Sequence, residues 1–141
     1  MKILNSKQYL RQAYKLNELI KDKKERLAYL QDMQGSISAI DYSKDKVQTS
    51  QSGDAGFTIQ VSTKMLLEAE LEADIKRFEE LYVEISHAID DVEDTNCRLV
   101  LSKRYLLMKT WEQIADDIGY SLTQLHRIHK IALENFIVPQ S

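Results

Sequence analysis

Between Leu71 and Val92 the apolar residues recur in alternating steps of four and three, as they do on one face of a long helix. The residues of this seam are Leu71, Ile75, Phe78, Tyr82, Ile85, Ile89 and Val92. Because the heptad spacing continues without a break, it predicts a helix over about 62–93 that can pack as in a coiled coil.

A weaker seam with the same rhythm runs through residues 6–34. It consists of Ala13, Leu16, Ile20, Leu27 and Leu30, and Lys23 stands where a further apolar residue is due. We expect the two helices to pack together as an antiparallel hairpin. The same seams also allow a homodimer through the long helices, because two hairpins combined into a four-helix bundle bury more apolar surface. The sequence leaves both arrangements open.

Residues 35–60, between the two helices, are rich in Ser, Gly, Asp and Gln, with scattered apolar residues. This composition favours a flexible polar loop, and a partner-binding loop is the alternative. A loop of this length is unusual inside a compact domain. We therefore expect residues 1–96 to form a helical hairpin closed by a long loop.

Two helix starts and one helix end follow one another closely near the C-terminal end of the chain. Thr110 and Gln113 have the spacing of a capping box, in which the two side chains satisfy free backbone N–H groups at a helix start. Ser121 and Gln124 repeat this spacing, and Gly119 can adopt the left-handed conformation that ends a helix. The pattern predicts one helix that begins after Thr110 and a second that begins after Ser121.

Each of these short helices has one apolar face. The faces consist of Ile114, Ala115 and Ile118 in the first helix and of Leu125, Ile128 and Ala132 in the second. Because the turn is short, the two faces can meet as in a helix-turn-helix, whose second helix lies in the major groove of DNA. Any two short amphipathic helices joined by a tight turn share this pattern, but double-stranded DNA is the first candidate ligand.

The outward face of the second helix carries no acidic residue before Glu134. Its candidates for contact with base edges are Leu122, Thr123, Gln124, His126, Arg127 and Lys130. Gln can pair with adenine, Arg can pair with guanine, and the methyl groups of Leu or Thr can touch the methyl group of thymine. An acidic face would be repelled by the DNA phosphates, so this composition favours DNA binding.

The formal net charge of −3 is unevenly distributed along the chain. Residues 61–96 carry −8, whereas residues 1–34 carry +4 and residues 97–141 carry +2. An antiparallel hairpin would therefore bring opposite charges together, although each exposed ion pair contributes only about 0–1 kcal/mol. The small positive charge of the C-terminal segment predicts weak DNA binding in the absence of a partner.

Residues 97–136 resemble the fourth, promoter-binding region of bacterial sigma factors. The resemblance rests on Arg98 to Tyr105, Lys109 to Ala115, Gly119 to Ser121, and Leu133. The chain is most similar to small phage and prophage proteins of Gram-positive bacteria that have a sigma-like C-terminal end, akin to families of late-gene transcriptional activators. It departs from sigma factors at residues 122–124, where they usually carry basic residues early in the recognition helix.

The resemblance implies an all-α fold in which a sigma-like helix-turn-helix domain over 97–141 follows the long hairpin. It also implies late-gene activation through promoter DNA, with host RNA polymerase as a partner and the acidic second helix as one surface for it. The candidates for contact with DNA phosphates are Arg98, Lys103, Arg104, Lys109 and Ser121.

Several classes of site are not expected. The single cysteine, Cys97, excludes an intramolecular disulfide and is expected in the core, and the lack of a signal peptide or long apolar run predicts a cytoplasmic protein without membrane spans. His126 and His129 have no further metal ligands nearby in the sequence, so no metal or other cofactor is expected. No catalytic grouping predicts an enzyme. Trp111 and Tyr105 are expected to pack inside the helix-turn-helix.

Two other classes of protein remain open. A phage DNA-packaging protein, such as a small terminase subunit, also combines a helix-turn-helix with a coiled coil. A helical protein-interaction module that does not bind DNA is the other, and the acidic balance of the chain favours it.

Overall fold

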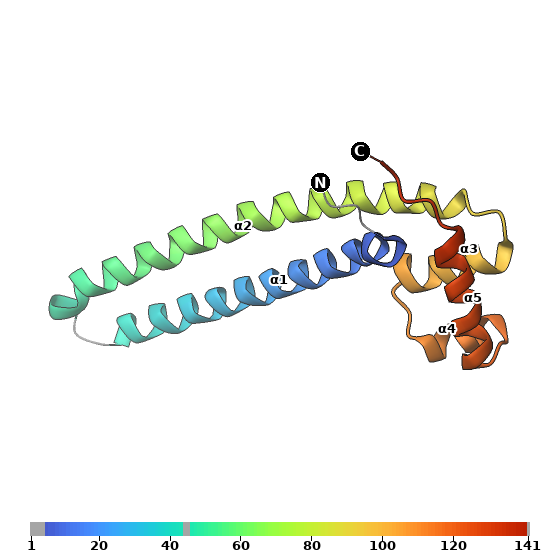
Figure 1. The fold of residues 1–141 in the computed structure, drawn as a ribbon. Helices are drawn as coiled ribbons and strands as arrows, with labels where there is room; N and C mark the ends of the chain where they lie inside the picture. Colours follow the sequence, from blue (N-terminus) through green and yellow to red (C-terminus); the bar gives the residue numbers. More distant parts are fainter. Residues whose placement is uncertain (1–4, 44–45, 141) are drawn as a thin grey trace. The chain divides into compact units, whose positions relative to one another are not determined.

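The computed structural model describes the backbone of residues 5–43 and 46–140, and their side chains except those of residues 34–55 and 57. The described part is all-helical, which confirms the predicted fold class (Figure 1). The elements are α1 (Ser6–Ser43), α2 (Lys46–Asp90), α3 (Thr95–Leu101), the π-helical turn η1 (Ser102–Leu106), α4 (Trp111–Ile118) and α5 (Leu122–Asn135).

The two long helices form the predicted antiparallel hairpin. The Tyr9 hydroxyl near the start of α1 donates a hydrogen bond of 2.6 Å to the Glu84 carboxylate near the end of α2. Lys23, further along α1, pairs with Asp74, which lies earlier in α2. A residue later in α1 therefore pairs with a residue earlier in α2, which requires that the two helices run antiparallel.

The position of Lys23 explains the interruption in the first seam. Its ammonium lies 2.5 Å from the Asp74 carboxylate and 3.9 Å from that of Glu70. The side chain of Lys23 is only 16% exposed, so this cation sits against the acidic helix. At this position the expected attraction between a basic and an acidic helix is confirmed.

The structure differs from the expected polar loop at 35–60. The first helix continues to Ser43 and the second begins at Lys46, so helix replaces most of the predicted loop. Residues 35–60 contain no proline, which would have broken a helix, and extension of an existing helix adds one hydrogen bond for each residue ordered. Each glycine in the segment opposes this by only about 0.5–1 kcal/mol.

Both predicted capping boxes are present. The backbone N–H of Gln113 donates to Thr110 Oγ1 at 3.2 Å, and the Gln113 side chain accepts in return from the Thr110 N–H at 3.0 Å. Ser121 and Gln124 form the same reciprocal pair at the start of α5. Gly119 ends α4 with a φ of 73°. These local signals set the start of both helices and the end of α4 where the sequence predicted them.

Gly119→Ala is expected to lower the free energy of unfolding by about 1 kcal/mol, because an L-residue pays for the left-handed conformation. Gly56→Ala is the matched control. A Cβ at either glycine meets no atom within 4 Å, so a steric clash contributes to neither substitution, and of the two glycines only Gly119 has a positive φ. Gly56 lies inside α2, where alanine should be neutral or stabilising. Urea unfolding followed by circular dichroism measures both, and equal effects would contradict the role of the left-handed turn.

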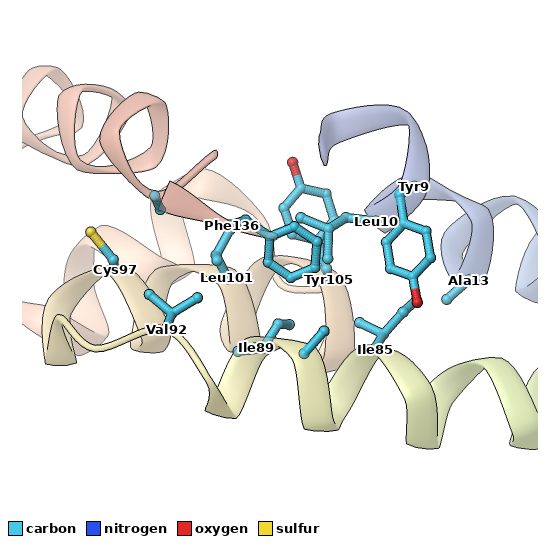
Figure 2. Packing of buried hydrophobic residues seen from close by; sticks show 12 residues of the cluster. Tyr9, Leu10, Ala13, Ile85, Ile89, Val92, Cys97, Leu101, Tyr105 and Phe136 are labelled. Carbon is cyan, nitrogen blue, oxygen red and sulfur yellow. The ribbon is translucent and has the colours of Figure 1, made fainter. Parts of the chain in front are cut away.

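The chain divides into two compact units, one of residues 1–17 with 77–141 and one of residues 18–76. This division differs from the boundary expected near residue 97. The reason is the larger core cluster, in which Leu10 of α1 and Ile89 of α2 pack with Leu101 and Phe136 from the C-terminal part (Figure 2). The start of α1 and the end of α2 therefore share one core with the short helices.

A second, smaller cluster holds the helix-turn-helix together. Val100 of α3, Ile114 of α4 and Leu125 of α5 are fully buried in it. The partly buried Trp111, Ala115, Ile118 and Ile128 pack around them, so the two apolar faces meet as predicted. Ala132 is the exception, because it belongs to the larger cluster.

Candidate nucleic-acid interface

All the residues predicted to read base edges lie on the exposed face of α5. Leu122 is 43% exposed. The exposed side chains are those of Leu122, Thr123, Gln124, His126, Arg127 and Lys130. The inward positions of the same helix, Leu125 and His129, are buried. The fold therefore brings the six candidates together on one surface.

Gln124 has a second task that competes with base reading. Its side-chain oxygen accepts hydrogen bonds from the Ser121 N–H at 3.1 Å and from the Ser121 hydroxyl at 3.2 Å. A bidentate pair with adenine requires that same oxygen as an acceptor and the amide nitrogen as a donor. Gln124 can read adenine in this way only if the capping box opens. Ser121, a candidate for phosphate contact, is committed to the same cap.

An aromatic cluster joins the start of α4 to the middle of α5. The ring of Trp111 lies 4.8 Å from that of His126 and 4.7 Å from that of His129, measured between centroids. The Arg104 guanidinium lies 4.4 Å from the centroid of the Trp111 ring. Trp111 packs inside the helix-turn-helix as predicted, and its surroundings leave it little surface for stacking on a base.

The two arginines among the predicted phosphate contacts donate hydrogen bonds to backbone carbonyls of the chain. Arg98 donates from two guanidinium nitrogens to the Val92 carbonyl, at 2.9 Å and 2.7 Å. It thereby ties α3 to the short connection that follows α2. Arg104 donates to the Lys109 carbonyl at 2.9 Å. The sequence pattern identified these residues by charge alone, whereas the fold engages part of each guanidinium in holding the backbone.

Lys103 and Lys109 share one carboxylate, that of Asp117 at the end of α4. Their ammonium groups lie 3.5 Å and 2.6 Å from it. The hydrogen bond from Lys109 lowers the pKa of Asp117, and the charge of Lys103 adds to this effect. The pairs are partly exposed, with side-chain exposures between 21% and 35%, so a phosphate could compete for either lysine.

His129 is the one buried polar or charged residue among those the structure describes. Its Nε2 atom lies 2.7 Å from the Tyr105 hydroxyl, which is also buried. Burial lowers the pKa of His129 to about 4, and the charges of Lys7, His126 and Arg104 act in the same direction. The imidazole is therefore neutral at physiological pH.

Acid is expected to destabilise the protein through His129. In the unfolded chain this histidine regains a pKa near 6.5, so between about pH 6.5 and 4 the unfolded state binds a proton that the folded state refuses. The free energy of unfolding should fall as pH decreases through this window, by about 1–2 kcal/mol after allowance for solvent screening. Above pH 6.5 this contribution is constant.

The measurement is urea unfolding at a series of pH values, compared between the native chain and His129→Gln. Glutamine can still hydrogen-bond Tyr105 but does not titrate, so its profile should be flatter below pH 6.5. His87→Gln is the control, since His87 is exposed on α2. A His129→Gln profile parallel to that of the native chain would show that this histidine does not sense acid.

Other classes of site find no support in the described residues. Among the residues whose side chains the structure describes, no group of three or more His, Cys, Asp or Glu side chains gathers as metal ligands would. No described helix is both long and apolar enough to cross a membrane. Cys97 is buried in the larger core cluster, as its sequence context predicted.

Comparison of the sequence with known families identifies the family of the chain. Residues 36–136, which are more than half of the chain, match the family model described as "Protein of unknown function (DUF1492)". No curated protein and no solved structure matches the chain. The family match covers α2, the helix-turn-helix and the turn η1 between them. The chain therefore belongs to the DUF1492 family.

Proposed function

We propose that the protein is a DNA-binding transcription regulator, of phage or prophage origin, that reads promoter DNA with α5. The observation that carries the proposal is the helix-turn-helix itself. Its two helices are set by two capping boxes and by Gly119, and they are held by the core of Val100, Ile114 and Leu125. This arrangement leaves the first turns of α5 free to enter a major groove.

The exposed face of α5 supports the same proposal. Arg127 and Lys130 are exposed, and no ion pair engages either of them among the described residues. Thr123 and Leu122 offer methyl groups to the same surface. On such a face, the Arg127 guanidinium can pair with guanine, the Lys130 ammonium attracts the DNA, and the methyl groups of Thr123 and Leu122 can touch thymine. We assign base reading to this face.

Binding by one copy alone should be weak. Arg98, Lys103 and Lys109 already contact groups within the chain, so fewer cations are available for phosphates than the sequence suggested. A partner would supply the missing affinity. We propose two: host RNA polymerase, as the sigma-like sequence implies, and a second copy of this chain.

Exposed apolar side chains on the long helices support the second copy. Within residues 18–76, Tyr29 and Met65 are each 66% exposed and Leu66 is 63% exposed. Tyr29 of α1 and Leu66 of α2 line one surface pocket together, and contiguous exposed apolar surface of this kind is typical of protein contacts. Two recognition helices in a dimer could then read half-sites about one DNA turn apart.

The proposal is tested by selecting bound sequences from random duplex DNA, with and without host RNA polymerase. Enrichment of a defined sequence supports it, and enrichment only with polymerase assigns polymerase as the partner. Sedimentation of the protein on the selected duplex reports whether one copy or two bind. Failure to enrich any sequence in either arm, with no salt-dependent binding to duplex DNA, would overturn it.

A further inference from the structure

A pocket of about 280 Å³ lies beside the helix-turn-helix, within the compact unit of residues 1–17 and 77–141. Its walls are formed by Lys7, Arg11 and Tyr14 of α1 and by Arg104, Tyr105 and Trp111 from the C-terminal part. The first turns of α1 are far from the helix-turn-helix in the sequence, and the shared core brings them together.

The charge of this pocket has one sign. Its lining includes the cations Lys7, Arg11 and Arg104 and no acidic side chain. Lys7 and Arg11 are four residues apart on α1, so their side chains lie on the same face. Within the part of the chain that the structure describes, none of the three forms an ion pair, whereas Lys103 and Lys109 nearby are paired with Asp117.

The same cations act on the buried groups behind the pocket. After burial, the charge of Lys7 is the next cause that lowers the pKa of His129, and Arg104 contributes as well. Burial raises the pKa of Tyr105, and the charges of Arg104 and Arg11 oppose that rise. Positive charge is therefore concentrated at this place, and an anion would offset the mutual repulsion of the three cations.

The ligand that suits these walls is an anion with several oxygens. A guanidinium has donors left after one of its hydrogen bonds, so Arg104 can hold the Lys109 carbonyl and still donate to a ligand. Trp111 is unsuited to stacking on a base, because Arg104 and His129 already lie against its ring. Arginine and lysine side chains are the usual ligands of phosphate groups in proteins.

We propose that Lys7, Arg11 and Arg104 form a binding pocket for a phosphate group. The group can come from the backbone of duplex DNA or from a free phosphorylated molecule. The DNA source rests on the proposed function and suits the fold, because the first helix of a helix-turn-helix crosses the DNA backbone and Trp111, in the pocket wall, begins α4. On this assignment the start of α1 extends the DNA-binding surface.

The first arm of the test uses inorganic phosphate. Trp111 is the only tryptophan of the chain and lines the pocket, so its fluorescence reports on the site. Phosphate, compared with chloride at equal ionic strength, should change this fluorescence. The double variant Lys7→Gln, Arg11→Gln should bind phosphate at least about tenfold more weakly, since each lost group removes a charge-assisted hydrogen bond. Both side chains are exposed, and circular dichroism verifies that the variant is folded.

The second arm measures binding to duplex DNA over a range of salt concentrations. For the double variant, the slope of the logarithm of the binding constant against that of the salt concentration should become shallower by about 1–2. The control is Lys24→Gln, Lys76→Gln, which removes two exposed positive charges from the other compact unit and should keep the native phosphate response and slope.

The two arms separate the possible sources. Loss in both arms assigns the phosphate to DNA. A phosphate response that depends on Lys7 and Arg11, in a protein that binds duplex DNA neither alone nor with host RNA polymerase, supports the pocket with a free phosphorylated ligand and overturns the proposed function. Native binding to duplex DNA that the double variant fully retains, together with no difference in the phosphate arm, overturns the pocket and leaves the proposed function standing. If the native chain and the double variant behave alike in both arms, the pocket is overturned whether or not the protein binds duplex DNA.

Discussion

Leu10→Ala is expected to lower the free energy of unfolding by about 2–5 kcal/mol, the range for removal of a fully buried leucine side chain. Leu10 has no exposed surface and packs in the larger core cluster with Ile85, Leu101 and Phe136 (Figure 2). The substitution leaves a cavity where the start of α1, the end of α2 and the C-terminal part meet. It should therefore weaken the helix-turn-helix unit from a position distant in the sequence.

The measurement is urea unfolding followed by the fluorescence of Trp111, which lies in that unit. Leu19→Ala is the matched control, because Leu19 is a leucine of the same helix that is 54% exposed, and its loss should cost no more than about 0.5 kcal/mol. An unchanged midpoint for Leu10→Ala would mean that α1 does not stabilise the C-terminal helices.

Arg127→Ala is expected to weaken binding to the selected DNA site by about 1–3 kcal/mol, which is roughly a tenfold to hundredfold loss of affinity. Arg127 is exposed on α5, and its guanidinium fork can donate two parallel hydrogen bonds to guanine. The loss should be much smaller on a duplex in which the contacted guanine is replaced. Competition binding on the two duplexes, at one salt concentration, measures this difference.

Two further variants separate base reading from charge. Arg127→Lys keeps the positive charge but loses the fork, so it should retain salt-dependent binding to random DNA and lose preference for the selected site. Arg77→Ala removes the same charge from an exposed position on α2 and should leave both properties unchanged. Equal losses for Arg127→Ala on both duplexes would assign Arg127 to a phosphate instead of a base.

The roles of the basic residues show how far charge alone can be interpreted. Arg98, Lys103 and Lys109 were candidates for phosphate contact because they are cations near the helix-turn-helix. The structure engages them with the Val92 carbonyl and the Asp117 carboxylate. Lys7 and Arg11 were not candidates, and their only sequence signal was a spacing of one helical turn within a basic segment. The fold decides which group each cation contacts, and the pattern of charges along the sequence does not reveal that partner.

The sequence alone determined where α4 begins and ends, where α5 begins, and the seam of the hairpin. A capping box satisfies backbone groups with side chains three residues away, and an apolar seam follows from helical periodicity, so both are local properties. The tertiary structure decided that the start of α1 shares a core with the C-terminal helices, that His129 is buried against Tyr105, and that Lys103 and Lys109 pair with Asp117 while Lys7 and Arg11 line a pocket with Arg104. These features depend on contacts between residues far apart in the chain, whose burial and charge arise only when the helices pack.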